Sequence, residues 1–532
     1  MSLAPSVRDV TPPNAAPQPE FGVRLAIGLL GVLLAAMTAG LIGRVPGLVL
    51  ADLQGALGVG HDEGSWLTTA YSAGELAAMP FATWFATTFS LRRFHLAMLA
   101  CALTISIVIP FVEDLSLLLG LRLVQGMVAG ALIPILMMSA LRFLPASIKL
   151  YGLALFALTA TFSPNVALWL AALCVDRFDD WRWVYWHVVP PGIFAGILVA
   201  WGIPKSPLIL SRLPQGNWFG MSLGLPGLAL LVIGVDQGVR LEWFHSPLIS
   251  ALLLVGGAFT TLYLVSEWLH PAPFVSLKLL ARRNLWLGFI VFVFMLMTLS
   301  TGVTLPANVL SSLQGFRMEQ SSPLGLIVGL PQLVLGPLVA FLLYQRWVDA
   351  RHVFAAGLAC ISAACWIASD ITDEWMVHQF LPVGVLHAVG QPMAIISLLF
   401  LATSVVQPAE GAFVAGLVNI LRVFSATLSS AFIGEMTAQR SQFHSELLLD
   451  HAALQVARLP IVDVLTTTLA TVVTQQASVL ATADIYRIFG IVAMLLVPLV
   501  LCLQHIPAPE HYATAPTAST DGAALPLTPN PK

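Results

Sequence analysis

The sequence predicts an all-helical integral membrane protein with about fourteen transmembrane helices. Of its 532 residues, 58% are hydrophobic and only 10% are charged, and the mean hydropathy is +0.87. A soluble protein does not carry so large an apolar fraction. The apolar residues also fall into separate runs of the length that an α-helix needs to cross a hydrocarbon core about 30 Å thick.

Fourteen apolar runs define the predicted spans, which we number in chain order. They lie near residues 23–48, 65–88, 95–112, 115–140, 150–173, 184–203, 218–236, 247–268, 285–310, 322–344, 353–369, 376–402, 411–434 and 485–504. Several contain proline or glycine, which membrane helices tolerate where neighbouring groups satisfy the freed backbone.

The charges between the runs predict the orientation of the chain. Basic residues gather in the loops on one side, at Arg92, Arg93, Arg142, Lys149, Lys205, Arg212, Lys278, Arg282, Arg283, Arg346 and Arg351. Acidic residues gather on the other side, at Asp62, Glu63, Glu113, Asp114, Asp176, Asp179, Asp180, Asp370, Asp373 and Glu374. Because basic loops stay in the cytoplasm, the pattern places both termini there.

The two ends of the chain, residues 1–20 and 505–532, are rich in proline and alanine, and we expect both to be disordered. No convincing cleavage site follows the first segment, so no signal peptide is predicted. The longest connection, residues 435–484, is expected to face outward. Its apolar residues Phe443, Leu447 and Leu454 have helical spacing, which predicts a short amphipathic helix. This helix either offers a docking surface or lies on the protein's own outer face.

A weak internal repeat divides the chain. When span 1 is set against span 9, the basic turn after span 2 corresponds to the basic turn after span 10. The pattern predicts an N-terminal six-helix half at 21–204, two inserted spans with their loops at 205–284, and a C-terminal six-helix half at 285–504. Transporters built from repeats have this organisation.

Span 4 contains the stretch LRLVQGMVAGALIP at 121–134, where Arg122 lies inside an apolar run. An ionised side chain near the bilayer centre costs roughly 2.5–3.5 kcal/mol on insertion scales, so it persists where it faces a cavity or a partner. Gln125 lies on the same helix face, and Gly126 and Gly130 allow another backbone to approach closely. Arg122 is therefore a functional candidate, with a structural arginine–carboxylate pair as the alternative.

Two further ionisable residues share this level of the membrane. Glu75 lies roughly 16 Å from the outer end of span 2, counted at 1.5 Å per residue, and Arg44 and Arg122 lie at a similar depth. Glu75 is the best candidate for a proton carrier, because changes in its separation from the arginines would alter its proton affinity. A static ion pair that neutralises Glu75 is the alternative.

The second half offers candidates for a substrate cavity. Arg422 and Asn419 lie midway through span 13, and His387 and Gln391 lie in span 12. Together with Gln125 they are compatible with a polar lining, although buried histidines more often serve packing. Asp236 and Glu267 lie near the ends of the inserted spans and are expected at the membrane interface.

Several classes of protein are excluded. The net charge of −3 argues against a nucleic-acid partner. The five cysteines are scattered without disulfide or zinc spacing. No metal motif, nucleotide-binding loop or catalytic constellation is present, so we expect neither an enzyme nor a cofactor.

Six short motifs occur in a recognisable order. They are WLTTAY at 66–71, RLVQG at 122–126, WRWVYWHVVP at 181–190, DQGVRLEWFHSP at 236–247, RN at 283–284 and NILR at 419–422. In this order the chain resembles the fourteen-span drug:proton antiporters of the major facilitator superfamily, of the EmrB/QacA type. The resemblance covers about residues 22–505.

The resemblance implies the major facilitator fold and a secondary active exporter that exchanges protons for small amphipathic or aromatic compounds. It also implies a bacterial inner membrane, with a periplasmic adaptor and an outer-membrane channel as partners. Three stretches depart from the family pattern, namely MTAG at 37–40, ATTFSLRR at 86–93 and SPNVAL at 163–168. The missing acid of span 1 favours an alternative, export of one specific metabolite or organic anion. A membrane enzyme or sensor on the same fold is the alternative from another class.

Overall fold

The computed structural model describes residues 21–145, 147–407, 410–456 and 465–508, and within these ranges the chain is helical without a strand. Of the ends predicted to be disordered, 1–20 and 505–532, residues 1–20 and 509–532 lie outside the described residues. The longer helices are α1 (Val23–Leu48), α3 (His61–Thr88), α4 (Leu91–Val108), α5 (Leu115–Phe143), α10 (Trp218–Gly238), α11 (Pro247–Leu269), α16 (Ala350–Ala368), α17 (Leu381–Thr403), α18 (Gly411–Val456) and α19 (Leu465–Leu501).

Four of the predicted spans are each built from two shorter helices. These are α6 (Lys149–Ala157) with α7 (Phe162–Ala172), α8 (Trp183–Trp186) with α9 (Val189–Gly202), α12 (Arg283–Thr298) with α13 (Thr304–Gln314), and α14 (Met318–Gly329) with α15 (Gln332–Leu343). Pro331 separates α14 from α15, and Gly302 lies between α12 and α13. Proline removes a backbone donor and glycine lowers helix propensity, which accounts for these two breaks.

Thirteen helical segments of the described chain are long and apolar enough to cross a membrane. Helix α3 is not among them, although its 28 residues suffice in length. It carries Asp62, Glu63 and Glu75, and it packs against α5 and α10, which are both candidate spans. We therefore take α3 as the fourteenth predicted span. The all-helical membrane fold predicted from the sequence is confirmed.

Glycines bring α3 and α5 into close contact. A Cβ atom on Gly126 would meet the backbone of Tyr71, and one on Gly130 would meet the backbone of Glu75. Conversely, Gly74 lies against the backbone of Leu123. The close approach predicted for Gly126 and Gly130 is thus present, and it holds the turn of α3 that contains Glu75 against α5.

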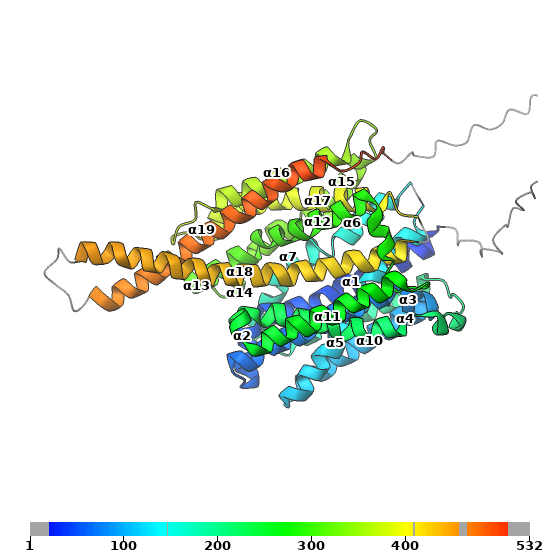
Figure 1. Ribbon diagram of the computed structural model, residues 1–532, viewed down its shortest axis with the longest axis horizontal. Coiled ribbons are helices and arrows are strands. Elements are labelled where there is room, and N and C mark those ends of the chain that lie inside the picture. The colour runs from blue at the N-terminus through cyan, green and yellow to red at the C-terminus, as the bar shows by residue number, and fades with distance from the viewer. Residues whose placement is uncertain (1–20, 146, 408–409, 457–464, 509–532) are drawn as a thin grey trace, which may run out of the picture.

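The helices α18 and α19 extend beyond the rest of the molecule (Figure 1). Phe443 and Leu447 lie in a helix, as predicted, but the expectation that this helix is short is wrong, because both residues belong to the continuous helix α18. Their side chains are exposed, and Arg440 and His444 on the same helix contact Asp484 of α19. Leucine and charged residues favour helix through this region, so the helix has no local reason to stop at the membrane boundary.

The inserted helices α10 and α11 pack against each other, and α10 also contacts α3 and α18. Gly227 and Gly256 allow the pair to approach closely. The predicted division into 21–204, 205–284 and 285–504 is compatible with this packing and stays a prediction, as does the orientation of the chain in the membrane.

Candidate functional site

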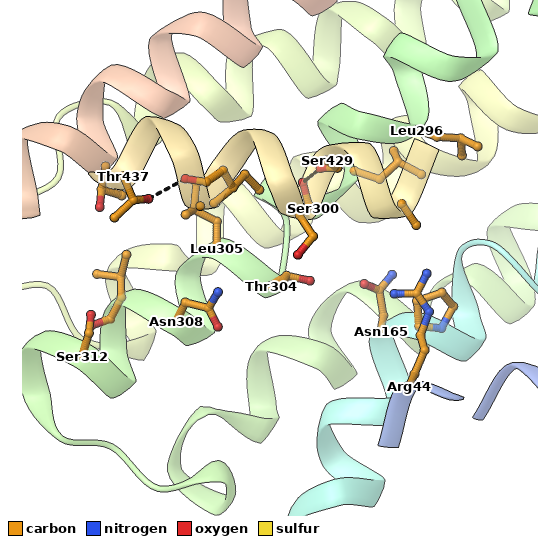
Figure 2. Close-up of a pocket in the computed structure, with 18 of the residues that line it drawn as sticks. Arg44, Asn165, Leu296, Ser300, Thr304, Leu305, Asn308, Ser312, Ser429 and Thr437 are labelled. Carbon is orange, nitrogen blue, oxygen red and sulfur yellow. Dashed lines mark hydrogen bonds between the residues drawn. The ribbon is translucent and has the colours of Figure 1, made fainter. Parts of the chain in front are cut away.

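A cavity of about 640 Å³ lies between helices from distant parts of the sequence. Its walls come from α1, α7, α12, α13, α17, α18 and α19. Figure 2 shows Arg44 and Asn165 near one end, and Ser312 and Thr437 towards the other. The second group lies towards the end of the molecule from which α18 and α19 project. The volume suits a small organic molecule.

Arg422 on α18 lines one end of the cavity and pairs there with Glu75 on α3, which is not itself a lining residue. Its Nη2 atom lies 3.7 Å from the Oε1 atom of Glu75. Only 7% of the Arg422 residue is exposed, yet its Nε and Nη2 atoms have no hydrogen-bond partner among the described residues. The two helices belong to different predicted halves, so the ion pair joins those halves.

Arg44 on α1 lines the same end of the cavity. Its side chain is exposed and makes no ion pair or hydrogen bond with any residue that the structure describes. Arg44, Glu75 and Arg422 are close enough to interact electrostatically. Two guanidinium groups therefore face one carboxylate, and this end of the cavity is positive when Glu75 is ionised.

Arg122 also interacts electrostatically with Glu75, but it forms no ion pair with it among the described residues and does not line the cavity. It is fully buried, and it donates hydrogen bonds to the carbonyl oxygens of Leu67 at 3.3 Å and Ile42 at 3.4 Å and to Gln125 Oε1 at 2.7 Å. Its guanidinium carbon lies 4.7 Å from the ring centre of Tyr71. No carboxylate pairs with it in the described chain, so the alternative of a structural arginine–carboxylate pair at this position is wrong. Arg122 instead binds the backbones of α1 and α3 to α5.

Gln125 lies away from the cavity, contrary to the prediction. Its amide donates to Ser106 at 2.8 Å, and its oxygen accepts from Arg122, so it connects α5 with α4. Asn419 is also buried outside the cavity wall. Its amide donates to the carbonyl oxygen of Ala415 at 2.8 Å, while its oxygen has no hydrogen-bond partner among the described residues.

A chain of polar side chains leads from the cavity into α17. Asn165 donates to Gln391 Oε1 at 3.1 Å, and Gln391 lies 3.4 Å from His387 Nδ1. His387 Nε2 in turn lies 3.1 Å from the hydroxyl of Thr301. Gln391 and Asn165 line the cavity, whereas His387 is buried behind them. The structure thus places Arg44, Gln391 and Arg422 on the cavity wall.

Hydroxyl groups form a part of the lining that sequence reasoning missed. They belong to Ser300, Thr304, Ser312, Ser429, Ser430, Thr437, Ser478 and Thr482. On α18 the cavity residues recur at helical spacing, because Ser429 follows Arg422 by seven positions and Thr437 follows by fifteen. This periodicity starting from Arg422 was the available signal. Asn165 had a signal too, since it lies in the departing stretch SPNVAL.

The inserted helix α10 contacts both helices that carry the Glu75–Arg422 pair. Asp236 accepts a hydrogen bond from Thr69 on α3, and Gln237 donates to the same hydroxyl at 2.6 Å. Beyond α10, Trp243 donates to Glu435 on α18 at 2.7 Å. Glu267 on α11 accepts from Asn217 at 2.9 Å and from the Val275 N–H at 2.8 Å, which indicates a structural role.

The fold and the cavity define a membrane transport protein. The family model described as Major Facilitator Superfamily matches residues 29–430, and the chain belongs to this superfamily. Two solved structures have the same fold: the human organic anion transporter MFSD10 (TETRAN), with a TM-score of 0.55 and 13% identity, and the proton:xylose symporter XylE, with 0.58 and 11%. The match to MFSD10 covers 90% of this chain and 99% of that chain, and the match to XylE covers 91% of this chain and 97% of that chain.

Relatives with bacterial resistance names match much of the sequence. The probable multidrug resistance protein EmrY of Escherichia coli is 26% identical over 367 residues, 68% of this chain and 69% of that protein. The fatty acid resistance protein FarB of Neisseria gonorrhoeae is 22% identical over 493 residues, which are 91% of this chain and 96% of that protein. The multidrug export protein EmrB of Escherichia coli is 22% identical over 450 residues, which are 81% of this chain and 84% of that protein. The family predicted from the six motifs is confirmed.

Proposed function

We propose that this protein is a proton-coupled exporter of small amphipathic or aromatic compounds in a bacterial inner membrane. The ion pair between Glu75 and Arg422 is the observation that carries the proposal, because it joins helices of the two predicted halves beside the cavity. Alternating access requires such halves to move against each other around a fixed site. The names of EmrY and EmrB, which refer to multidrug resistance and export, support the substrate class.

Protonation of Glu75 removes its attraction to Arg422. At an effective dielectric constant of 20, two unit charges at this separation attract by about 4 kcal/mol. A change from 1:99 to 99:1 between two conformations needs about 5.5 kcal/mol. Loss of this attraction is of the order that such a switch requires, so proton binding at Glu75 would favour a conformation in which the two helices separate and the cavity changes its side of access.

A second candidate substrate is an organic anion. Arg44 has no partner among the described residues, and Arg422 keeps two donor atoms free. A carboxylate on the substrate would compete with Glu75 for Arg422, and an arginine fork binds a carboxylate through two parallel hydrogen bonds. FarB, named for fatty acid resistance, supports this candidate.

Flux into proteoliposomes tests the proposal. With an imposed pH gradient, wild-type protein is expected to drive an amphipathic cation and a carboxylate of matched size, while Glu75→Gln loses the gradient dependence for both. Glu63→Gln is the matched control, because Glu63 lies on the same helix but at its exposed start. Gradient-driven flux that survives in Glu75→Gln would contradict the proposal. The substrate that the wild type prefers decides between the two candidates.

A periplasmic adaptor and an outer-membrane channel are proposed partners. The projecting part of α18 exposes Phe443 and Leu447, which offers an apolar surface on the side predicted to face outward. Substituting both residues with serine is expected to leave flux in proteoliposomes unchanged and to reduce resistance in whole cells. An equal loss in both assays would assign this surface to the transporter itself.

A further inference from the structure

A second, smaller cavity lies at the opposite end of the molecule from the projecting helices. Its volume is about 270 Å³, and it is lined by Ser90, Arg92, Arg93, Leu96 and Lys205. It lies where α3 ends and α4 begins, at the right of Figure 1. Three of its five residues are basic and none is acidic, so the cavity suits an anion.

The chain after α9 is held in place beside this cavity. The Ile209 N–H donates to the carbonyl oxygen of Thr88 at 2.9 Å, and Arg212 Nη1 donates to the hydroxyl of Thr87 at 3.0 Å. These bonds attach the segment that contains Lys205 to the last turn of α3. Lys205 therefore lies near Arg92 and Arg93 although it is more than a hundred residues away in the sequence.

The basic groups are available to a ligand. Arg92, Arg93 and Lys205 form no ion pair or hydrogen bond with any part of the chain that the structure describes. The first backbone bond of α4 runs from the Phe94 N–H to the Ser90 oxygen. The N–H groups of the preceding first turn have no acceptor inside the helix, and a helix N-terminus attracts anions.

Ser90 gives an independent indication of a ligand. It lines the cavity and is only 2% exposed, yet its hydroxyl has no hydrogen-bond partner among the described residues. Leaving a buried polar group unsatisfied costs about 1–3 kcal/mol. A serine hydroxyl turns about one bond, so an oxygen acceptor bound in the cavity would satisfy it.

We propose that this cavity binds the phosphate group of an anionic ester through Arg92, Arg93, Lys205 and Ser90. A phosphate offers several acceptor oxygens, which match guanidinium forks and a hydroxyl donor together. The cavity lies where the candidate span of α4 begins at Leu91 and where the span Trp183–Gly202, which precedes Lys205 in the chain, ends. Exposed Trp201, Leu208 and Ile209 lie within four residues of Lys205 in the sequence, and tryptophan is enriched at the membrane interface. The head group of an anionic phospholipid is therefore the favoured source, and a soluble phosphate ester is the other.

Thermal unfolding of the purified full-length protein in a non-ionic detergent tests the site. The midpoint is measured against increasing dioctanoyl phosphatidylglycerol, dioctanoyl phosphatidylcholine, glycerol 1-phosphate and inorganic phosphate, because a ligand that binds only the folded state raises it. We expect phosphatidylglycerol to raise the midpoint more than phosphatidylcholine. Each of Arg92→Gln, Arg93→Gln and Lys205→Gln should weaken binding about five-fold, the equivalent of one basic residue near an anionic surface.

Two further variants sharpen the result. Ser90→Gly removes the hydroxyl without backbone strain, because the φ angle of Ser90 is 71°, which glycine adopts readily. It should weaken binding as well. Arg346 is an exposed basic residue in another predicted cytoplasmic loop, so Arg346→Gln should leave binding unchanged.

Equal responses to glycerol 1-phosphate and phosphatidylglycerol would support the phosphate site and contradict the lipid source. The proposal is overturned if neither ester binds more tightly than phosphatidylcholine, or if the four cavity variants bind like the wild type.

Discussion

Arg422 and Glu75 face each other across the two predicted halves at 3.7 Å, a distance that exceeds a charge-assisted hydrogen bond of 2.7–2.9 Å. The pair therefore attracts through charge without using up the hydrogen-bonding capacity of the guanidinium group. The Nε and Nη2 atoms of Arg422 make no hydrogen bond to any described residue, while the residue lines the cavity. One arginine can thus respond both to the protonation of Glu75 and to a ligand in the cavity.

The coupling between these two residues is measurable with a double-mutant cycle. Arg422→Gln leaves the Glu75 carboxylate buried without its cation and should destabilise the protein more than the double variant with Glu75→Gln. We expect a coupling of about 1–3 kcal/mol in the free energy of unfolding. The pair of Arg317 and Asp176 is the control, at 3.6 Å; because the Arg317 side chain is 79% exposed, this pair should give less than about 1 kcal/mol. Similar values for both cycles would show that the buried pair has no special role.

Arg122 should prove necessary for stability as well as for transport. Arg122→Ala would remove a donor from the Gln125 oxygen and from the carbonyl oxygens of Leu67 and Ile42, and a buried acceptor left unsatisfied costs about 1–3 kcal/mol. Arg122→Lys retains the charge but lacks the planar fork, so it should rescue stability only in part. Unfolding in denaturant and proton-driven flux are measured together. Loss of flux at wild-type stability would assign Arg122 to the transport step instead.

The contact between α3 and α5 predicts a sharp contrast between two glycines of α5. Gly126→Ala places a methyl group against the backbone of Tyr71, and overpacking of this kind costs typically 1–3 kcal/mol. Gly120 in the same helix has open space around it, so Gly120→Ala should be neutral or slightly stabilising. The unfolding midpoints of the two variants test this expectation. Equal destabilisation would mean that helix propensity alone, and not contact with α3, determines the effect.

Local patterns in the sequence predicted the spans and the close contact at Gly126 and Gly130, because helix length and small-residue spacing are properties of one segment. They also indicated Arg422 and Gln391 as cavity residues. The partner of Glu75 could not be found in this way. Counting residues from the end of a span estimates how deep a side chain lies in the membrane. It does not show how the helix is rotated about its axis, nor which helix of the other half lies opposite Glu75.

The error over Arg122 has the same origin. A buried arginine needs acceptors, and its sequence neighbours cannot show whether these are carboxylates or the backbone carbonyls of α1 and α3. Periodicity likewise could not show that α18 continues without a break to Val456. The residues of this helix change from apolar to polar after the predicted span 411–434, which predicts that the helix ends there. In the structure only the surroundings of the helix change, and the helix itself continues.

The binding of a carboxylate ligand should depend on pH through Glu75. When Glu75 is ionised it holds Arg422, so an anionic ligand must compete with it; once Glu75 is protonated, both Arg44 and Arg422 face the ligand alone. Carboxylate binding to purified wild-type protein is therefore expected to tighten as the pH falls from 8.5 to 5.5, the range over which binding would be measured. Glu75→Gln mimics the protonated state, and it should bind at least about ten-fold more tightly than the wild type at the high end, a difference of about 1.4 kcal/mol. Its affinity should also be independent of pH.

An uncharged ligand of the same shape serves as the control, because it should bind both proteins alike. If both proteins show the same pH dependence for the carboxylate, Glu75 is not the proton site, and Asp236 becomes the next acid to test because its described partner, Thr69, is neutral.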